Sequence, residues 1–447
     1  MSPTSSGGGT NIKTGGEQSS ASLKRQEEVL PMAKLEQRRY NCEPERQVRF
    51  LPLFIERGLG MEQKKIKVMT VFGTRPEAIK MAPIVLELQK HPDKITPVVA
   101  VTAQHREMLD QVLGLFNITP DHDLDIMAQG QTLFDITSKA MMGLDKVLEE
   151  EKPDIVLVHG DTTTTFAGAL AAYYHQTTVG HVEAGLRTHD KYSPFPEEMN
   201  RKLTGCIADL NFAPTETSES NLLAENVKPE SIFVTGNTVI DALHHTVKKD
   251  FQFADELLQN IDFAGKRIIL VTTHRRENLG EPMRHVYKAL RQLTEEFDDV
   301  EVVFPVHKNP KVREVVREEL GGLDKVHLID PLDYEPFANL MSRAHLILTD
   351  SGGVQEEAPA LGKPVLVLRD TTERPEAVAA GTVKLIGTDR DVVYNEAKTL
   401  LTDKEAYNKM AEAVNPYGDG KASERIIQAI LYHYGLADNR PDVFAGK

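Results

Sequence analysis

Short apolar runs rich in β-branched residues recur along most of the chain, and amphipathic stretches separate them. The first runs are IKVMTVF (66–72), ITPVVAV (95–101) and DIVLVHGD (154–161), with the amphipathic stretch FDITSKAMMGLDKVLEE (134–150) before the third. Strands that are almost entirely apolar are typical of a parallel sheet whose two faces are covered by helices. The alternation therefore predicts repeated βα units and a doubly wound α/β fold.

The strand–helix pattern restarts after Gly236. We expect a first α/β domain over residues 65–238 and a second over residues 239–420, with a helix near 421–435 that packs back on the first. Residues 1–64 differ from the rest, because their start is rich in Ser, Gly and Thr. Such a composition cannot form a core, so we expect a disordered extension there.

Charge and cysteine content exclude several classes of protein. The chain has 52 Lys and Arg against 67 Asp and Glu, a formal net charge of −15, and no dense basic run, so nucleic acid is a poor candidate partner. Cys42 and Cys206 provide neither a disulfide framework nor a zinc site, which fits a reducing cytoplasm and no bound metal. No apolar stretch approaches the roughly 20 residues of a membrane helix, and we expect no secretory signal, because nothing resembles one with a charged start and an apolar middle.

The first candidate phosphate site is VFGTRPEAIK, residues 71–80. A strand ends at Phe72 and Gly73 turns the chain, and Thr74 with Glu77 has the spacing of a capping box, so a helix begins at this point. The free N–H groups of that helix and the guanidinium of Arg75 can bind a phosphate. The simpler alternative is an ordinary helix start that carries a surface arginine.

The second candidate phosphate site is LILTDSGGVQEEAPALG, residues 346–362. Ser351, Gly352 and Gly353 join a strand to a helix and let the backbone approach a diphosphate. Glu357 lies about one turn into the helix, where it can accept hydrogen bonds from ribose hydroxyls, although it can also be a solvated acid. Neither a dinucleotide-binding glycine motif nor a P-loop occurs, so we expect no redox cofactor and no NTPase activity.

Three carboxylates follow strands of the first half: Asp161, Glu183 and Glu197. Each has a simpler explanation, because Asp161 can cap a helix and Glu197 can complement a helix dipole. Together they suggest proton transfer, because successive strand ends of one sheet face one cleft. His274 ends the run RIILVTTH beside Arg275 and is a candidate ligand of a phosphate or leaving group, although a lone histidine is usually structural.

Several long strings closely resemble those of the non-hydrolysing UDP-N-acetylglucosamine 2-epimerases, in order and with compatible spacing from about residue 65 to 434. They are VMTVFGTRPEAIKMAP, VHGDTTTT, GHVEAGLRT, YSPFPEEMNR, THRREN, LTDSGGVQEEAP, LRDTTERPEA and NPYGDG. The resemblance implies a GT-B fold, in which two Rossmann-like domains with parallel sheets form an interdomain cleft. It also implies interconversion of UDP-GlcNAc and UDP-ManNAc through 2-acetamidoglucal, without a cofactor, in a cytoplasmic homodimer that supplies ManNAc for surface polysaccharide.

The resemblance also assigns roles to residues. Asp161, Glu183 and Glu197 match the catalytic carboxylates, although which one is the base is not readable from the sequence. The implied ligands of the substrate and the leaving group are Arg75, Lys80 and His274, and those of UDP are Phe337, Ser351, Gly352, Gly353 and Glu357. An allosteric second UDP-GlcNAc is implied at Gln104, Glu197, Arg275 and His307. The sequence departs from that allosteric pattern at Glu107 and Gly130.

Three other functions remain open at this point. A GT-B glycosyltransferase would share the UDP site but pass the sugar to an acceptor. A hydrolysing epimerase would release free ManNAc and UDP. A non-enzymatic UDP-sugar sensor would not need the three carboxylates.

Overall fold

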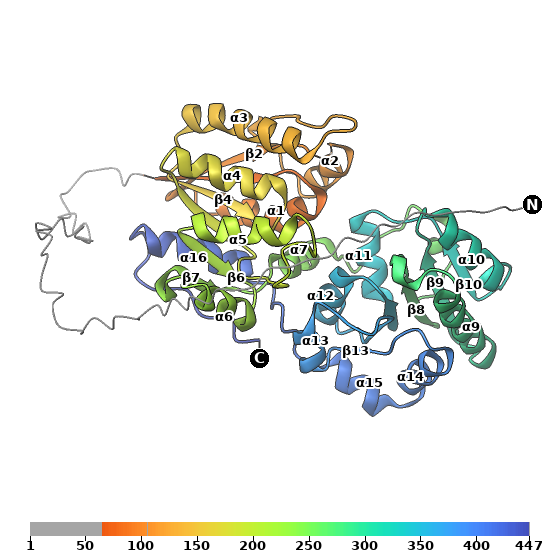
Figure 1. Ribbon diagram of the computed structural model, residues 1–447. Helices are drawn as coiled ribbons and strands as arrows, with labels where there is room; N and C mark the ends of the chain where they lie inside the picture. Colours follow the sequence, from red (N-terminus) through yellow and green to blue (C-terminus); the bar gives the residue numbers. More distant parts are fainter. Residues whose placement is uncertain (1–64, 105, 447) are drawn as a thin grey trace, which may run out of the picture. The chain divides into compact units, whose positions relative to one another are not determined.

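The computed structural model describes residues 65–104 and 106–446 (Figure 1). These residues fall in one compact unit that spans residues 58–447. The expected disordered extension, residues 1–64, lies outside the described residues. The predicted α/β fold is confirmed, because two parallel sheets alternate with helices along the chain.

The first sheet has seven parallel strands in the order β3-β2-β1-β4-β5-β6-β7. Its strands are β1 (Ile66–Phe72), β2 (Ile95–Val101), β3 (His122–Asp123), β4 (Ile155–His159), β5 (Thr178–Val182), β6 (Leu210–Ala213) and β7 (Ile232–Val234). The apolar runs predict each of these strands except β3. That strand has only two residues, both polar, and pairs at the edge of the sheet, so no hydrophobic pattern identifies it.

The second sheet has six parallel strands in the order β10-β9-β8-β11-β12-β13. Its strands are β8 (Arg267–Thr272), β9 (Val300–Pro305), β10 (Val326–Ile329), β11 (Leu346–Thr349), β12 (Val365–Val367) and β13 (Val383–Leu385). All six follow the apolar runs of the second half of the sequence.

Helices follow most of the strands. In the first half they are α1 (Arg75–Gln89), α2 (Arg106–Leu115), α3 (Leu133–Glu151), α4 (Thr163–Tyr174), α5 (Glu197–Ile207), α6 (Glu216–Ala224) and α7 (Thr238–Thr246). In the second half they are α8 (Glu256–Gln259), α9 (Glu281–Glu296), α10 (Pro310–Leu320), α11 (Tyr334–Arg343), α12 (Gly352–Ala360), α13 (Pro375–Ala380), α14 (Arg390–Thr402), α15 (Lys404–Ala411) and α16 (Ala422–His433).

Strand β1 shows how helices cover both faces of the first sheet. Val68 and Phe72 join a buried cluster with α1, α7 and α16, whereas Met69 and Val71 join a different cluster with α3 and α4. This division follows from the two-residue period of a strand.

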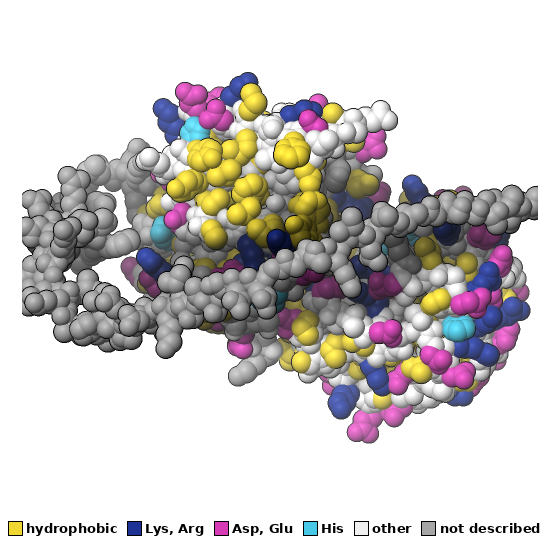
Figure 2. Space-filling model, viewed as in Figure 1, with side chains coloured by type: hydrophobic (Ala, Val, Ile, Leu, Met, Phe, Trp, Pro, Cys, Tyr) yellow, Lys and Arg dark blue, Asp and Glu magenta, His cyan; other side chains and the backbone are white. Residues whose placement is uncertain are grey.

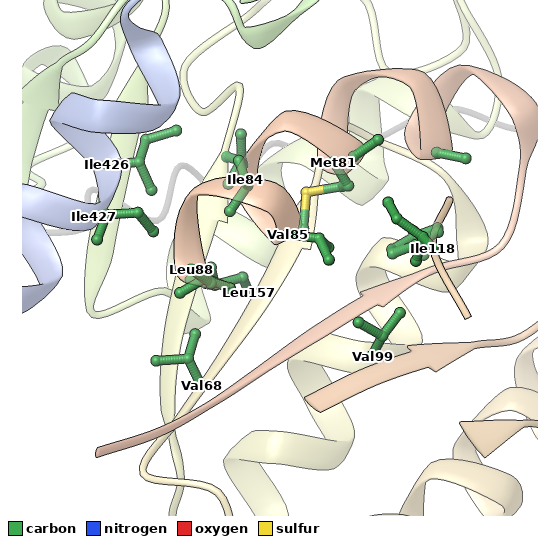
Figure 3. Close-up of a cluster of buried hydrophobic side chains, with 14 of the residues drawn as sticks. Val68, Met81, Ile84, Val85, Leu88, Val99, Ile118, Leu157, Ile426 and Ile427 are labelled. Carbon is green, nitrogen blue, oxygen red and sulfur yellow. The ribbon is translucent and has the colours of Figure 1, made fainter. Parts of the chain in front are cut away.

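The C-terminal helix α16 packs on α1 rather than on the second sheet. Ile426 and Ile427 lie opposite Ile84 and Leu88, next to Val68 (Figure 3). Because Ile426 is fully buried, its truncation to alanine would destabilise the fold by about 2–5 kcal/mol. The chain therefore returns to its first half after it has formed the second sheet.

Both sheets contain a switch point, where neighbouring strands send their connections to opposite faces. In the first sheet it lies between β1 and β4, and in the second between β8 and β11. Open α/β sheets bind ligands beyond the carboxyl ends of the strands at such points. The segments that follow these four strands are therefore the first places to look for a site.

Candidate active site

The first switch point begins with the predicted capping box. The Thr74 hydroxyl accepts a hydrogen bond from the Glu77 N–H, and the Glu77 carboxylate accepts one from the Thr74 N–H at 2.8 Å. Glu77 also accepts hydrogen bonds from Gly73 at 3.1 Å and from the Thr162 hydroxyl at 2.7 Å. This buried carboxylate therefore fixes the start of α1 against the turn that follows β4.

Four of the predicted site residues line one cavity of about 410 Å³ beside the start of α1. They are Arg75, Gln104, Asp161 and Glu197. Arg75 is the first residue of α1, and Glu197 is the first residue of α5. The cavity thus combines a guanidinium, two carboxylates and an amide at the carboxyl edge of the sheet.

Asp161 is held by two residues of α5. Its Oδ2 accepts hydrogen bonds from Arg201, at 3.0 Å from Nε and 2.6 Å from Nη2, and its carbonyl accepts one from Asn200 at 2.8 Å. Arg201 also donates to Glu198, a fully buried carboxylate that accepts the N–H groups of Thr188 and His189. The same arginine thus orients Asp161 and fixes the loop before α5.

Glu197 differs from the other two carboxylates. Its Oε2 is buried but has no hydrogen-bond partner among the residues that the structure describes. No ion pair involving Glu197 is present in the described part of the chain either, whereas Asp161 and Glu183 each have one. An unpaired carboxylate oxygen that lies beside a cavity is available to a ligand.

Glu183 lies in a strained backbone conformation directly after β5. Its φ of 62° is in the left-handed region, which is uncommon for residues other than glycine and is concentrated at functional sites. Its carboxylate forms an ion pair with Lys80 of α1, accepts a hydrogen bond from Asn237 at 2.8 Å, and lies 3.5 Å from the His159 ring. Lys80 and Asn237 both bind Oε1, so these two contacts fix one oxygen, and Oε2 is the one that faces His159.

The charge state of this pair follows from its surroundings. Burial disfavours the Glu183 carboxylate, but Lys80 outweighs burial and holds the pKa of Glu183 well below its usual range. Burial likewise opposes the charge of Lys80, but Glu183 and Glu356 raise the pKa of that amine. Burial lowers the pKa of His159 to about 3, so its ring is neutral at pH 7. Lys80 and Glu183 are therefore both charged.

The second switch point is organised by Asp350, which is fully buried after β11. Its carboxylate accepts the N–H groups of His274 and Arg275, each at 2.9 Å, and lies 3.1 Å from Nδ1 of His274. Burial would raise the pKa of Asp350, but these hydrogen bonds lower it overall. The ring of His274 stacks on that of His307 with centroids 5.8 Å apart.

Helix α12 begins with Ser351 as its N-cap, followed by Gly352 and Gly353. A Cβ atom added at either glycine would meet no other atom within 4 Å. The first turn of this helix therefore faces open space with its N–H groups available, as a diphosphate requires.

Glu357 lies farther along α12 and is buried. Burial and the neighbouring Glu356 raise the pKa of Glu357 to about 7. Phe337 of α11 is half-buried and packs against the core of the second sheet.

Direct contacts join the predicted residues in three sets. The first surrounds the 410 Å³ cavity, the second is the pair Lys80 and Glu183, and the third is His274 with Arg275, His307 and the start of α12. No hydrogen bond or ion pair of the described residues joins His274 to Arg75. The expected allosteric set is divided accordingly: Gln104 and Glu197 line the cavity, and Arg275 and His307 lie by the second sheet. Glu107 and Gly130 are exposed.

Sequence reasoning missed several residues that contact the predicted ones. Arg201 lies three positions after Glu198, which it binds, so helical spacing could have paired those two, whereas its contact with Asp161 spans 40 positions. Asn237 has no local pattern that marks it, because its partner Glu183 lies 54 positions away in the sequence.

The described residues contain no group of three or more His, Cys, Asp or Glu side chains arranged to hold a metal. Within the same part of the chain, every helix is too short or too polar to cross a membrane.

Comparisons with known proteins agree with one another. A sequence model of the UDP-N-acetylglucosamine 2-epimerase family matches residues 86–431. The UDP-N-acetylglucosamine 2-epimerase of Bacillus subtilis (strain 168) is 62% identical over 385 residues, which are 86% of this chain and 100% of that protein. A crystal structure of a UDP-N-acetylglucosamine 2-epimerase has a TM-score of 0.81 and 60% identity, and the match covers 86% of this chain and 100% of that one. The enzyme from Neisseria meningitidis bound to UDP-GlcNAc has a TM-score of 0.70 and 52% identity, over 82% of this chain and 100% of that one.

Proposed function

The chain belongs to the UDP-N-acetylglucosamine 2-epimerase family, and we propose that it interconverts UDP-GlcNAc and UDP-ManNAc without net hydrolysis. The Neisseria meningitidis relative was solved bound to UDP-GlcNAc, which supports the same substrate here. The product would supply ManNAc units for cell-surface polysaccharide. The observation that carries the proposal is the arrangement of Asp161, Glu183 and Glu197 at one sheet edge: Arg201 binds the first, Lys80 binds the second, and an oxygen of the third has no partner among the described residues.

The proposed reaction has two balanced steps. A base takes the proton from carbon 2 while the bond between carbon 1 and the UDP oxygen breaks, which leaves UDP and 2-acetamidoglucal with a double bond between carbons 1 and 2. UDP then adds back to carbon 1, and a proton reaches carbon 2 on the opposite face. The carbon proton is only weakly acidic, so the step needs placed acid–base groups and stabilisation of the departing UDP.

The three carboxylates suit different roles in these steps. Glu183 is held as an anion by Lys80, so it can stabilise positive charge that develops on the sugar, and it orients the Lys80 amine. Asp161 is oriented by Arg201, as a base that must face one carbon atom requires. Glu197 lines the same cavity and has a buried oxygen without a partner among the described residues, so we assign to it the proton transfer on the opposite face of carbon 2.

The departing UDP is assigned to the second switch point. The open first turn of α12 favours negative charge, and Ser351, Gly352 and Gly353 leave room for the diphosphate. His274, which is oriented by the buried Asp350, supplies a further donor. Glu357 is the candidate ribose ligand and Phe337 the candidate uracil contact. Gln104, Arg275 and His307 remain candidates for a second, allosteric UDP-GlcNAc.

The products formed from UDP-GlcNAc alone distinguish this function from its alternatives. We expect UDP-ManNAc to appear without an acceptor and to reach equilibrium with the substrate. An unchanged donor until an acceptor is added would indicate a glycosyltransferase. Free ManNAc and UDP as main products would indicate a hydrolysing epimerase. A sensor would bind UDP-GlcNAc and leave it intact.

We also propose that two copies of the chain associate through the apolar face of α3 and α4. Large hydrophobic side chains gather on this face (Figure 2). Phe134 is 85% exposed, and Met142 and Tyr174 are 69% and 67% exposed. Exposed apolar patches of this kind are typical of interfaces. A Phe134→Asp/Met142→Asp variant is expected to elute as a monomer where the unchanged chain is a dimer, and an equal mass for both would contradict this assignment.

A further inference from the structure

Asn237 lies where the chain leaves the first sheet, between β7 and α7. Its side chain is buried, and its backbone N–H donates to the carbonyl of Tyr417 at 2.6 Å. Tyr417 belongs to the segment that returns from the second half before α16. The start of α7 therefore contacts the returning segment at this asparagine.

The orientation of the Asn237 amide is set by its contacts. Its Oδ1 accepts the N–H of Val239 at 3.0 Å, which caps α7. Its Nδ2 donates to Glu183 at 2.8 Å and to Glu356 at 3.4 Å. The opposite orientation would place an oxygen between two carboxylates and leave the helix end uncapped, so only this one satisfies all the groups.

The two carboxylates belong to different halves of the site. Glu183 follows β5 and pairs with Lys80, whereas Glu356 lies on α12 and pairs with Arg374. Glu356 is next to Glu357 and on the same helix that Ser351 caps. In the described part of the chain, Asn237 is the only side chain hydrogen-bonded to both carboxylates.

We propose that Asn237 is a positioning residue whose amide holds Glu183 in its reactive orientation and couples it to α12. This role rests on the proposed function, because it assigns the UDP diphosphate to α12 and the stabilisation of positive charge on the sugar to Glu183. A displacement of α12 on binding UDP would move Glu356 and so act on Glu183 through the amide that binds both. A carboxylate turned away by about 1 Å can cost about 10²-fold in rate.

Two substitutions separate this role from the capping role. Asp and Ser are both good N-cap residues, so Asn237→Asp and Asn237→Ser retain the start of α7. The aspartate presents an oxygen instead of a donor to the two carboxylates, and the serine does not reach them. We expect each variant to lower kcat by about 10²-fold with little change in KM for UDP-GlcNAc.

The pH dependence supplies a readout that a purely structural role would not change. At low pH the introduced carboxyl group of Asn237→Asp is protonated and can donate again, so the activity of this variant relative to the unchanged chain should rise as pH falls, whereas that of Asn237→Ser should not. Glu183 and Glu356 face the amide directly, and the charged and titratable groups that act on these two carboxylates are Lys80, His159, Arg374 and Tyr417. The double variant Asn237→Asp/Glu356→Gln, which places an amide donor opposite the new acid, should recover part of the lost kcat.

The control is Asp389→Asn, the reverse exchange at the exposed N-cap of α14, which should leave kcat unchanged. Circular dichroism and thermal unfolding confirm that each variant is folded, and Asn237→Ser tests the role even if the buried aspartate prevents folding. Unchanged kcat in a folded Asn237→Ser chain would overturn the positioning role. Failure of the unchanged chain to epimerise UDP-GlcNAc would instead overturn the proposed function, and this role with it.

Discussion

Lys80 and Glu183 form a buried ion pair although they lie 103 positions apart in the chain. Lys80 projects from α1, and Glu183 follows β5 in a left-handed backbone conformation. Because β1 and β5 lie on either side of β4, the sheet order brings the two groups to one edge. The first prediction tests this pair.

Single and double substitutions of this pair should not have additive effects on stability. Lys80→Met or Glu183→Gln leaves a buried charge or a buried donor without its partner, which costs about 3–5 kcal/mol. We expect the double variant Lys80→Met/Glu183→Gln to be less destabilised than the sum of the single variants, as measured by urea unfolding. Turnover should fall by more than about 10²-fold in all three. Strictly additive losses of stability would show that the two groups are not coupled.

Arg201→Lys tests the orientation of Asp161. A lysine keeps the charge but cannot bind Asp161 and Glu198 with the planar geometry of arginine. We expect kcat to fall by about 10–10²-fold, with a smaller effect on KM for UDP-GlcNAc. The matched control is Arg291→Lys on α9, where Arg291 forms an exposed ion pair with Glu295. It should leave kcat and KM unchanged. Equal kcat and KM for the two variants would show that Arg201 does not orient Asp161 for catalysis.

Gly353→Ala should separate stability from ligand binding. No atom lies within 4 Å of a Cβ at this position, and helical alanine is favoured over glycine by about 1 kcal/mol, so the fold should be retained or stabilised. The added methyl group would occupy the open space assigned to the diphosphate, so we expect weaker binding of UDP by calorimetry. Gly114→Ala, at an equally open position of α2, should leave UDP binding unchanged. Unaltered UDP affinity in Gly353→Ala would exclude close approach of the ligand there.

Glu357 should make stability depend on pH. Its pKa is raised from 4.5 to about 7 by burial and by Glu356. The folded state therefore holds a proton that the unfolded state has lost between these values, so the contribution is fully present below pH 4.5 and is lost as pH rises through 7. Between pH 4.5 and pH 8 the free energy of unfolding of the unchanged chain should fall by about 3 kcal/mol relative to that of Glu357→Gln, which has no such proton to lose. Parallel pH profiles of the two chains would contradict the raised pKa.

The sequence predicts strands, capping and switch-point residues well because these depend on local pattern. The run IKVMTVF matches β1 residue for residue, and Thr74 with Glu77 forms the predicted capping box. Strand β3 was missed because its two residues are polar, so no apolar pattern marks them, and they are identified as a strand only by their pairing with β2. Met199, Leu203 and Ile207 recur every four residues and so indicate a helix at α5, but Leu203 is 41% exposed rather than buried in the core.

The partners of the site residues could not be predicted in the same way. Asn237 contacts Glu183 and Glu356, which lie 54 and 119 positions away, and only the folded sheets bring these groups together. Glu77 was expected to cap its own helix, but it also binds Thr162, 85 positions away. Local spacing identifies which residues follow a strand, whereas the charge state and orientation of each depend on contacts between distant segments.

The central claim is that the proton on carbon 2 is removed and replaced while UDP departs and returns. Incubation of the chain with UDP-GlcNAc in heavy water, followed by NMR, tests it most directly. We predict deuterium at carbon 2 of both UDP-ManNAc and recovered UDP-GlcNAc, at a rate at least about 10²-fold lower in Asp161→Asn. Formation of UDP-ManNAc with the original hydrogen at carbon 2 in every product molecule would contradict the mechanism.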